Sequence, residues 1–302
     1  MMRTRTPRPA GFTLIELLVV IALIAALAAI TAGAAMRVRA SQMAKTNDMT
    51  VDKLQKALDQ QWKATIDNLK ATNTQNRVPQ SLVTYCTTGD GKEQQRAHAL
   101  WIYMNLRNEF PQNVSEAQSP VSIGGYSLQC KKTFATLANS GTTDEQGAAC
   151  LFAMLNEKAR GGAVSLNDDI MSATIETPAG RAFRDAYGQP ITFRRLFNDG
   201  NEIQLPPFIN PKNASKDPID VDGLLSGWGP AASANTVTPR ESAANLVGIP
   251  DQNKFGRPDF MGLNHVATVL SAGPNKVLEN SPTGTTDDFW GYRLRRLGNK
   301  GD

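Results

Sequence analysis

The hydrophobic pattern of the chain is dominated by one long apolar stretch near its start. From Phe12 to Met36 the only charged residue is Glu16. A helix of about 25 residues is about 37 Å long, which is enough to cross a bilayer with some tilt. A carboxylate near the beginning of such a span is costly in hydrocarbon, so we expect Glu16 to have a partner. The pattern predicts a transmembrane helix over residues 12–36.

The helical pattern continues beyond this stretch but becomes one-sided. Large apolar residues recur at helical spacing: Leu54, Leu58, Trp62, Ile66 and Leu69. Charged residues occupy the other faces, which is the pattern of a half-buried amphipathic helix. We therefore predict an amphipathic segment over residues 37–72, with Trp62 in the core of the folded domain.

No proline separates the two segments, because none occurs between Pro9 and Pro79. Proline is the residue that most strongly breaks a helix. The two segments are therefore predicted to form one helix of about 55 to 60 residues, apolar on all sides in its first half and on one side in its second.

The rest of the chain predicts shorter elements, helices first and strands afterwards. These are a loop over residues 72–81, a helix over 98–110, a helix from 143 that ends at Gly161 and Gly162, and strands over 191–194, 265–270 and 292–294. Thr142 and Glu145 have the spacing of a capping box at the start of the second of these helices. Residues 205–262 are rich in Pro, Gly, Asn and Asp and read as loop. The fold class is α+β, with a small antiparallel sheet.

The charge distribution bears on the partners of the chain. The formal net charge is +4, and Arg3, Arg5 and Arg8 lie within the first 11 residues, which contain no acid. Without those residues the net charge is 4 − 3 = +1. The basic balance is therefore largely a topology signal for a cytoplasmic N-terminal segment, and no nucleic-acid partner is predicted.

Two other interpretations of the apolar stretch are open from composition alone. An ordinary secretory signal also has a basic start and an apolar core, and cleavage near Ala32 to Ala35 would remove it. The stretch is, however, about twice as long as the apolar core of a usual signal. A plain uncleaved anchor is the second interpretation, and it leaves Glu16 without an explanation.

The three cysteines, Cys86, Cys130 and Cys150, leave two alternatives open. An extracytoplasmic domain could pair two of them and leave the third as a free thiol. The other alternative is that none is paired. Their spacings match no metal-binding motif.

The sequence from Gly11 to Val20 (Gly-Phe-Thr-Leu-Ile-Glu-Leu-Leu-Val-Val) resembles the cleavage and methylation site of type IV prepilins and type II secretion pseudopilins. The resemblance implies a pilin-like fold, in which a long N-terminal spine helix packs on a small antiparallel sheet, with additional helices inserted between them. It implies cleavage between Gly11 and Phe12 and methylation of the new Phe12 amine. It also implies that Glu16 pairs with the Phe12 ammonium of a neighbouring subunit in the filament.

The resemblance further implies partners and a location. The partners are a prepilin peptidase/methyltransferase, other pilin or pseudopilin subunits, an inner-membrane assembly platform and membrane lipid. The chain would be a single-pass inner-membrane protein with a cytoplasmic N-terminus and an extracytoplasmic domain. Its parts would be a leader over 1–11, the spine over 12–36 and 37–72, and a domain over 73–302 whose sheet covers about 181–302.

Two C-terminal motifs extend the resemblance. Residues 185–190 (Asp-Ala-Tyr-Gly-Gln-Pro) are similar to the turn that leads into the first sheet strand of major pseudopilins. Residues 270–275 and 286–289 are similar to that family's calcium-binding loop. The positions that could supply oxygen ligands are Ser271, Asn275, Asp287 and Asp288. The family commonly has an aspartate where this chain has Asn275, so an ordinary polar turn is the open alternative.

Catalytic motifs are missing from the sequence. The only histidines are His98 and His265, and there is no Gly-x-Ser-x-Gly motif and no zinc-binding histidine pair. Acidic residues at 217, 220 and 222 could form a second calcium loop or solvated turns. An enzyme is not predicted. The alternatives to a pseudopilin are a type IV pilus subunit with an adhesive or DNA-uptake role, and a membrane-tethered binding module or enzyme.

Overall fold

The computed structural model describes residues 14–71, 77–156, 170, 172–197, 219–220, 224–225, 266–278 and 287–293. By compactness the chain divides into two units, residues 1–46 and 47–302. Helix α1 (Leu14–Lys70) contributes its first half to the first unit and its second half to the second. The predicted leader over residues 1–11, together with Phe12 and Thr13, lies outside the described residues.

The predicted long helix is confirmed, because α1 is a single helix of 57 residues. Its second half buries the predicted stripe, with Leu54 and Leu58 fully buried. Trp62 packs against the same core, and its ring lies 5.0 Å from the ring of Phe110. Residues 47–70 therefore form part of the hydrophobic core of the folded domain, as the periodicity predicts.

The helices after α1 differ in part from the prediction. They are α3 (Gln80–Tyr85), α4 (Glu93–Glu109), α5 (Val114–Gln118), the short 3-10 helix η1 (Lys132–Phe134) and α6 (Thr143–Asn156). The loop predicted over 72–81 is wrong at its end, because α3 begins at Gln80 directly after Pro79. Proline disfavours helix interiors but is well tolerated at a helix start. Helix α4 also begins five residues earlier than predicted.

The capping box at the start of α6 is confirmed. The Glu145 carboxylate accepts a hydrogen bond from the Thr142 backbone N–H at 2.7 Å, and the Thr142 hydroxyl accepts one from the Glu145 N–H at 3.2 Å. These reciprocal bonds satisfy two donors at the helix start. The predicted stop at Gly161 and Gly162 lies outside the described residues.

The described strands form three separate antiparallel sheets. They are β1 (Val121–Ile123) with β2 (Tyr126–Leu128), β3 (Thr174–Thr177) with β4 (Gly180–Phe183), and β5 (Thr192–Phe197), β6 (Val266–Ser271) and β7 (Phe289–Trp290) in that order. In the third sheet Thr192 pairs with Leu270 and Phe193 with Val269. The strands predicted over 191–194 and 265–270 are thus confirmed within the described residues.

The strand predicted over 292–294 is wrong. The strand is β7, which pairs with β6 only at Leu270–Trp290 and Ser271–Phe289, and residues 291–293 form a helical turn instead. A side chain from α1 provides the physical reason. A Cβ on Gly291 would collide with the side-chain amide of Gln55, so the edge of β6 beyond Trp290 is occupied by that glutamine rather than by a strand.

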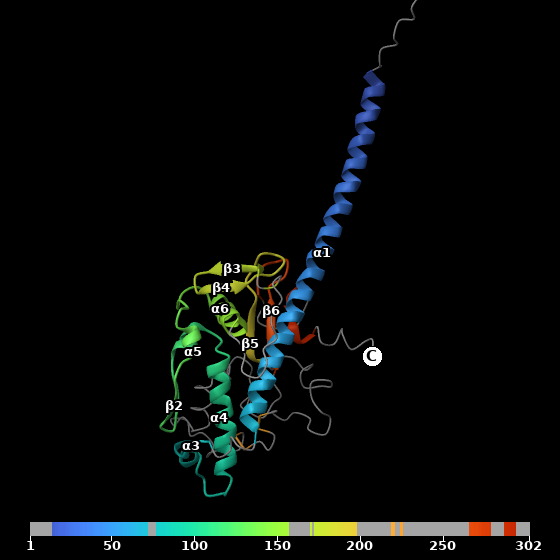
Figure 1. Cartoon of the computed structure of the whole chain (residues 1–302). Coiled ribbons are helices and arrows are strands. Elements are labelled where there is room, and N and C mark those ends of the chain that lie inside the picture. Colours follow the sequence, from blue (N-terminus) through green and yellow to red (C-terminus); the bar gives the residue numbers. More distant parts are fainter. Residues whose placement is uncertain are drawn as a thin grey trace, which may run out of the picture. The chain divides into compact units, whose positions relative to one another are not determined.

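Strands β5 and β6 lie between α6 and the second half of α1 (Figure 1). Helix α6 approaches closely through Gly147, where a Cβ would meet the Thr192 hydroxyl at 2.6 Å. Helix α1 contacts β6 through Gln55, whose side chain hydrogen-bonds to the β6 backbone. The mixture of helices and small antiparallel sheets is the predicted α+β class, and it matches a pilin-like fold in composition.

Candidate functional site: the N-terminal helix

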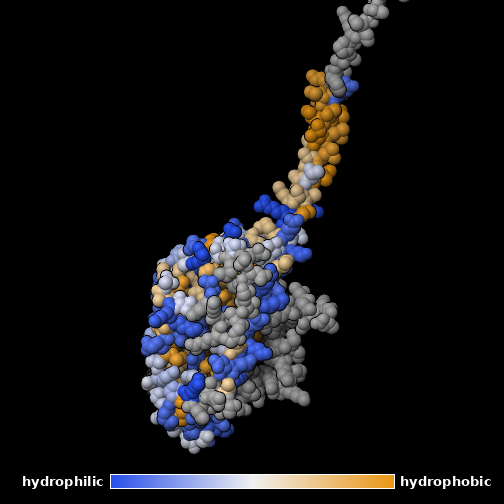
Figure 2. Space-filling model, in the orientation of Figure 1, coloured by the Kyte–Doolittle hydropathy of each residue, from blue (hydrophilic) through white to orange (hydrophobic). Residues whose placement is uncertain are grey.

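The first half of α1 exposes apolar side chains on every side. All residues from Leu14 to Gln42 are exposed, and Leu14 and Ile15 are 82% and 70% exposed. Figure 2 shows the upper part of this segment mainly in the colours of hydrophobic residues, with hydrophilic residues at the two ends of the segment, whereas the face of the domain in view is mixed. By its length and composition the helix is able to cross a membrane. Monomeric soluble proteins rarely expose so large a continuous apolar surface.

Glu16 is the acidic residue of the first turn of α1. Its side chain is exposed, and it lies near the positive end of the helix dipole, which favours a negative charge. Uncharged residues fill the 20 positions from Leu17 to Met36. The charge therefore lies at the beginning of the apolar segment and not in its middle.

The hydroxyl of Thr31 is satisfied within the apolar segment. It donates to the backbone carbonyls of Leu27 and Ala28, each at 3.0 Å. A hydroxyl bonded to its own helix does not require water, so Thr31 is compatible with an apolar environment.

The second half of α1 is joined to the sheet through a buried glutamine. Gln55 is 1% exposed; its amide nitrogen donates to the Ala267 carbonyl at 2.9 Å, and its amide oxygen accepts from the Val269 N–H at 2.8 Å. These are the backbone groups that a longer β7 would have bonded. Gln55 thus completes the hydrogen bonding of β6 in place of a neighbouring strand.

A second buried polar group joins α1 to two other segments. Asn47 donates to the Ser271 hydroxyl at 2.9 Å, and Ser271 donates to the Asp185 carboxylate at 2.8 Å. Asn47 and Ser271 are fully buried. The chain of hydrogen bonds connects the helix, the end of β6 and the turn before β5, and a satisfied buried network of this kind fixes a unique arrangement.

The turn predicted at residues 185–190 is confirmed. The second carboxylate oxygen of Asp185 accepts from the N–H groups of Tyr187 and Gln189 at 2.9 and 2.7 Å, and Gly188 has a φ of +88°. A left-handed φ of this kind favours glycine. The Tyr187 ring lies 6.2 Å from that of Phe289. The turn directs the chain into β5 and supplies Asp185 to the network of Asn47 and Ser271.

Residues 7–32 match the family model of the prokaryotic N-terminal methylation motif. The chain carries the type IV prepilin-like signature. The comparisons found no matching curated protein and no matching solved structure. The motif ends within the first half of α1, so the match covers the exposed apolar segment and leaves the folded domain unassigned. The methylation motif is a structural, pilin-type signature, and it fits a membrane-anchored protein.

Away from the methylation motif, three of the four predicted calcium ligands make hydrogen bonds within the chain. Ser271 is engaged with Asn47 and Asp185, and Asp287 accepts a hydrogen bond from the Asn275 N–H at 3.0 Å. The Asn275 amide oxygen accepts from the Val277 N–H at 2.8 Å, as in an ordinary Asx turn. Among the described residues no cluster of three histidine, cysteine, aspartate or glutamate side chains occurs, a set that does not include Ser271 and Asn275. The calcium loop stays a prediction, because residues 279–286 lie outside the described residues.

The other sequence candidates have structural contacts where they are described. Asp220 accepts from the N–H groups of Leu224 and Leu225 at 2.8 and 2.7 Å, which is the behaviour of a turn-capping carboxylate. His98 Nε2 lies 2.9 Å from the Leu69 carbonyl at the end of α1. His265 lies outside the described residues.

The three cysteines are free thiols, which resolves the alternatives left open by the sequence. Cys86 and Cys150 are fully buried, and burial raises the pKa of each thiol to about 12. Cys130 is half-buried. Thiols with such high pKa values are almost entirely protonated at neutral pH and are chemically inert.

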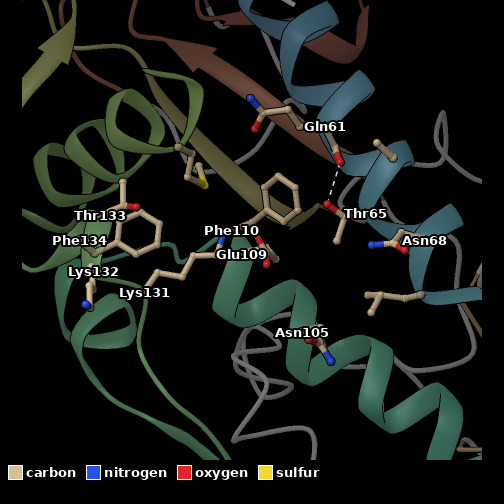
Figure 3. Close-up of a pocket in the computed structure, with 13 residues that line it drawn as sticks. Gln61, Thr65, Asn68, Asn105, Glu109, Phe110, Lys131, Lys132, Thr133 and Phe134 are labelled. Atoms are coloured by element: carbon tan, nitrogen blue, oxygen red, sulfur yellow. Dashed lines mark hydrogen bonds and ion pairs between the residues drawn. The ribbon is translucent and has the colours of Figure 1, made fainter. Parts of the chain in front are cut away.

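A cavity of about 320 Å³ lies between the second half of α1, the end of α4 and the segment around η1 (Figure 3). Its lining is mostly polar and includes Gln61 and Asn68 from α1 and the ion pair of Lys131 with Glu109. The cavity could hold a small polar molecule. Its described lining contains no histidine or cysteine, and its carboxylate is already paired, so it does not have the arrangement of an acid–base or nucleophilic site.

A buried ion pair between α5 and β5 was not foreseen from the sequence. Arg195 is 1% exposed, and it donates to the Glu116 carboxylate and to the Phe110 carbonyl, both at 2.9 Å. Burial alone would raise the pKa of Glu116, but the charge of Arg195 and its hydrogen bonds outweigh burial and hold that pKa below its usual value. Arg195 falls on the same face of the alternating strand as Ile191 and Phe193, so the charge lies on the buried face and is compensated there by Glu116.

Proposed function

We propose that the chain is a prepilin-like structural subunit of a filament, either a type II secretion pseudopilus or a type IV pilus-like fibre. The observation that carries the proposal is the continuity of the helix. The methylation motif over residues 7–32 runs into a 57-residue helix whose second half is part of the core of a folded domain. An apolar segment that is exposed in the part of the chain that the structure describes then has two natural environments, a bilayer before assembly and a bundle of like helices afterwards.

The motif implies processing by a prepilin peptidase. In this proposal the enzyme cleaves between Gly11 and Phe12 and methylates the new amine of Phe12. Cleavage removes Arg3, Arg5 and Arg8 together and leaves two charges at the start of the helix, that amine and the Glu16 carboxylate.

Glu16 acts in assembly. In a filament its carboxylate would pair with the Phe12 ammonium of a neighbouring subunit, so that neither charge enters the apolar bundle alone. The exposed apolar side chains around Glu16 support this role, since they leave it on a surface that only another molecule can cover. Further partners are other pilin or pseudopilin subunits and an inner-membrane assembly platform.

Before assembly the protein would be a single-pass protein of the inner membrane, with residues 1–11 in the cytoplasm and residues 47–302 outside it. A calcium ion in the loop of residues 271–288 remains a separate proposal. The Asn47, Ser271 and Asp185 network already fixes the start of that loop, so the assembly role does not depend on the metal.

The test is the N-terminal mass of the full-length chain expressed with and without a prepilin peptidase. With the enzyme we expect a chain that begins at methylated Phe12, and without it a chain that retains the residues before Gly11. A Gly11→Val variant with the enzyme is the matched control and should remain uncleaved. An unprocessed chain in the presence of an active peptidase, or a chain that begins near residue 36, would overturn the proposal.

A further inference from the structure

A pair of arginines follows the apolar segment of α1 directly. After the uncharged residues 17–36, the next charged residues are Arg37 and Arg39. Twenty residues of helix span about 30 Å, which is the thickness of the hydrocarbon core of a bilayer. With residues 17–36 in that core, Glu16 lies at one boundary and Arg37 at the other. The two arginines then lie at the level of the lipid headgroups.

The two arginines point to different sides of the helix. Residues two positions apart are separated by about 200° around a helix axis, so Arg37 and Arg39 project in nearly opposite directions. Both are exposed. A protein partner on one side of the helix could contact only one of them, whereas lipid headgroups surround the helix and could contact both.

The arginines also have no acidic counterpart nearby in the chain. No aspartate or glutamate occurs between Glu16 and Asp48. In the described part of the chain the ion pairs involve other basic residues, and neither Arg37 nor Arg39 has a recorded contact with a carboxylate. Two exposed guanidinium groups next to an apolar span, with no acid nearby in the sequence, form a local positive charge that attracts the anionic groups of a membrane surface.

We propose that Arg37 and Arg39 form a collar that binds the phosphate groups of anionic phospholipids in the leaflet at the C-terminal end of the span. The proposal rests on the membrane anchoring in the proposed function and names its lipid partner. Guanidinium groups bind phosphate oxygens through two parallel hydrogen bonds, and their long stems allow the charge to reach the headgroup while the Cα stays near the hydrocarbon. Together with Glu16 the collar sets the depth of the helix in the membrane.

Lys45 provides an internal control for the geometry. It is exposed and lies on the same helix, nine residues after Met36, which is about 13 Å further along the axis. The headgroup region is only about 5–7 Å deep on each side of the hydrocarbon. Lys45 is therefore beyond the reach of direct headgroup contact, although it carries the same unit charge.

The experiment measures which lipids stay bound to the unassembled full-length chain. The protein is reconstituted in vesicles with equal amounts of phosphatidylcholine and phosphatidylglycerol, released with mild detergent, and its bound lipids are quantified by mass spectrometry. We expect phosphatidylglycerol to be enriched among the lipids bound to the wild-type chain. The double variant Arg37→Gln/Arg39→Gln should lose most of this enrichment, because each substitution should lower it roughly fivefold. Lys45→Gln should retain it. High salt should weaken the enrichment in the wild-type chain, because the contact is electrostatic.

The proposal is overturned if the wild-type chain shows no enrichment, or if Lys45→Gln reduces enrichment as much as the double substitution does. Near-UV circular dichroism verifies that each variant has a folded domain. Carbonate extraction of membranes tests the anchoring itself. If the chain is anchored and processed at Gly11 but shows no phosphatidylglycerol enrichment, the collar alone is refuted. If carbonate removes the chain from the membrane, the membrane anchoring is refuted as well.

Discussion

The two halves of α1 belong to one helix but obtain their stability from different sources. Residues 47–70 bury Leu54 and Leu58 in the core, and the side chains of Asn47 and Gln55 form hydrogen bonds with β6. Residues 14–42 are exposed throughout and make no comparable contacts among the described residues. The second half is packed by its own domain, whereas the first half has no comparable packing among the described residues and would be covered by the membrane or the filament of the proposed function.

This difference separates the effects of substitutions. A change in the first half should alter assembly or membrane behaviour and leave the unfolding of the domain unchanged. A change in the contacts of the second half, or in the core behind it, should destabilise the domain. Each prediction below tests this separation, with unfolding of the detergent-solubilised full-length chain followed by tryptophan fluorescence.

The largest effect is expected for Glu16→Ala in a filament assembly assay. Loss of one member of an apolar ion pair leaves the other charge without a partner, so assembly should fall by at least about 100-fold. The urea midpoint of the domain should be unchanged. Glu176→Ala, which removes an exposed carboxylate from β3, is the control and should assemble normally. Normal assembly of the Glu16→Ala variant would show that the carboxylate of Glu16 is not needed for assembly.

Arg195→Ala should give a large loss of domain stability, about 3–5 kcal/mol. The substitution leaves the buried Glu116 carboxylate without its cation. Arg181→Ala is the matched control: its pair with Glu176 is exposed on both sides, so its removal should cost less than about 1 kcal/mol. Similar losses for the two variants would contradict the role assigned to the buried pair.

Gln55→Leu should destabilise the domain by about 2–6 kcal/mol. Leucine has a similar size but leaves the Ala267 carbonyl and the Val269 N–H buried without partners, at about 1–3 kcal/mol for each group. Gln60→Leu changes an exposed glutamine on the same helix and should alter stability by no more than about 0.5 kcal/mol. If Gln55→Leu changed stability as little as Gln60→Leu does, the Gln55 side chain would not be needed to satisfy the backbone hydrogen bonds of β6.

The smallest effect concerns pH. The folded-state pKa of Glu116 is lower than its ordinary value of 4.5, so its ionised form stabilises the folded domain. This stabilisation is fully present above pH 4.5 and is lost as the pH falls through the lower folded-state pKa. Urea midpoints at pH 7 and pH 3 should therefore differ less for Glu116→Gln than for the wild-type chain. An identical pH dependence would assign the acid sensitivity to other carboxylates.

The sequence predicts α1 well because its signal is long and consistent. Twenty uncharged residues followed by a stripe of apolar residues, with no proline, have one simple structural solution. The capping box before α6 and the turn at Asp185 were also predictable, because both depend on residues within five positions of each other. The methylation motif is of the same local kind.

The polar contacts could not be predicted in this way. Gln55 has the appearance of an ordinary polar position on an amphipathic helix, and its partners lie more than 200 positions away. The end of β7 was misplaced for the same reason, since Gln55 takes the place of a strand beside Gly291. Short elements such as α3 carry too few residues for a periodic signal, and Pro79 suggested a loop where it marks a helix start.

The state of the cysteines has a consequence for the biogenesis of the protein. All three are thiols, so the folded domain owes none of its stability to oxidation. Its maturation requires no thiol oxidase or disulfide isomerase, and the fold is compatible with both reducing and oxidising compartments. The domain can therefore be produced in an ordinary reducing cytoplasm for biochemical work, and its folding need not wait for disulfide formation.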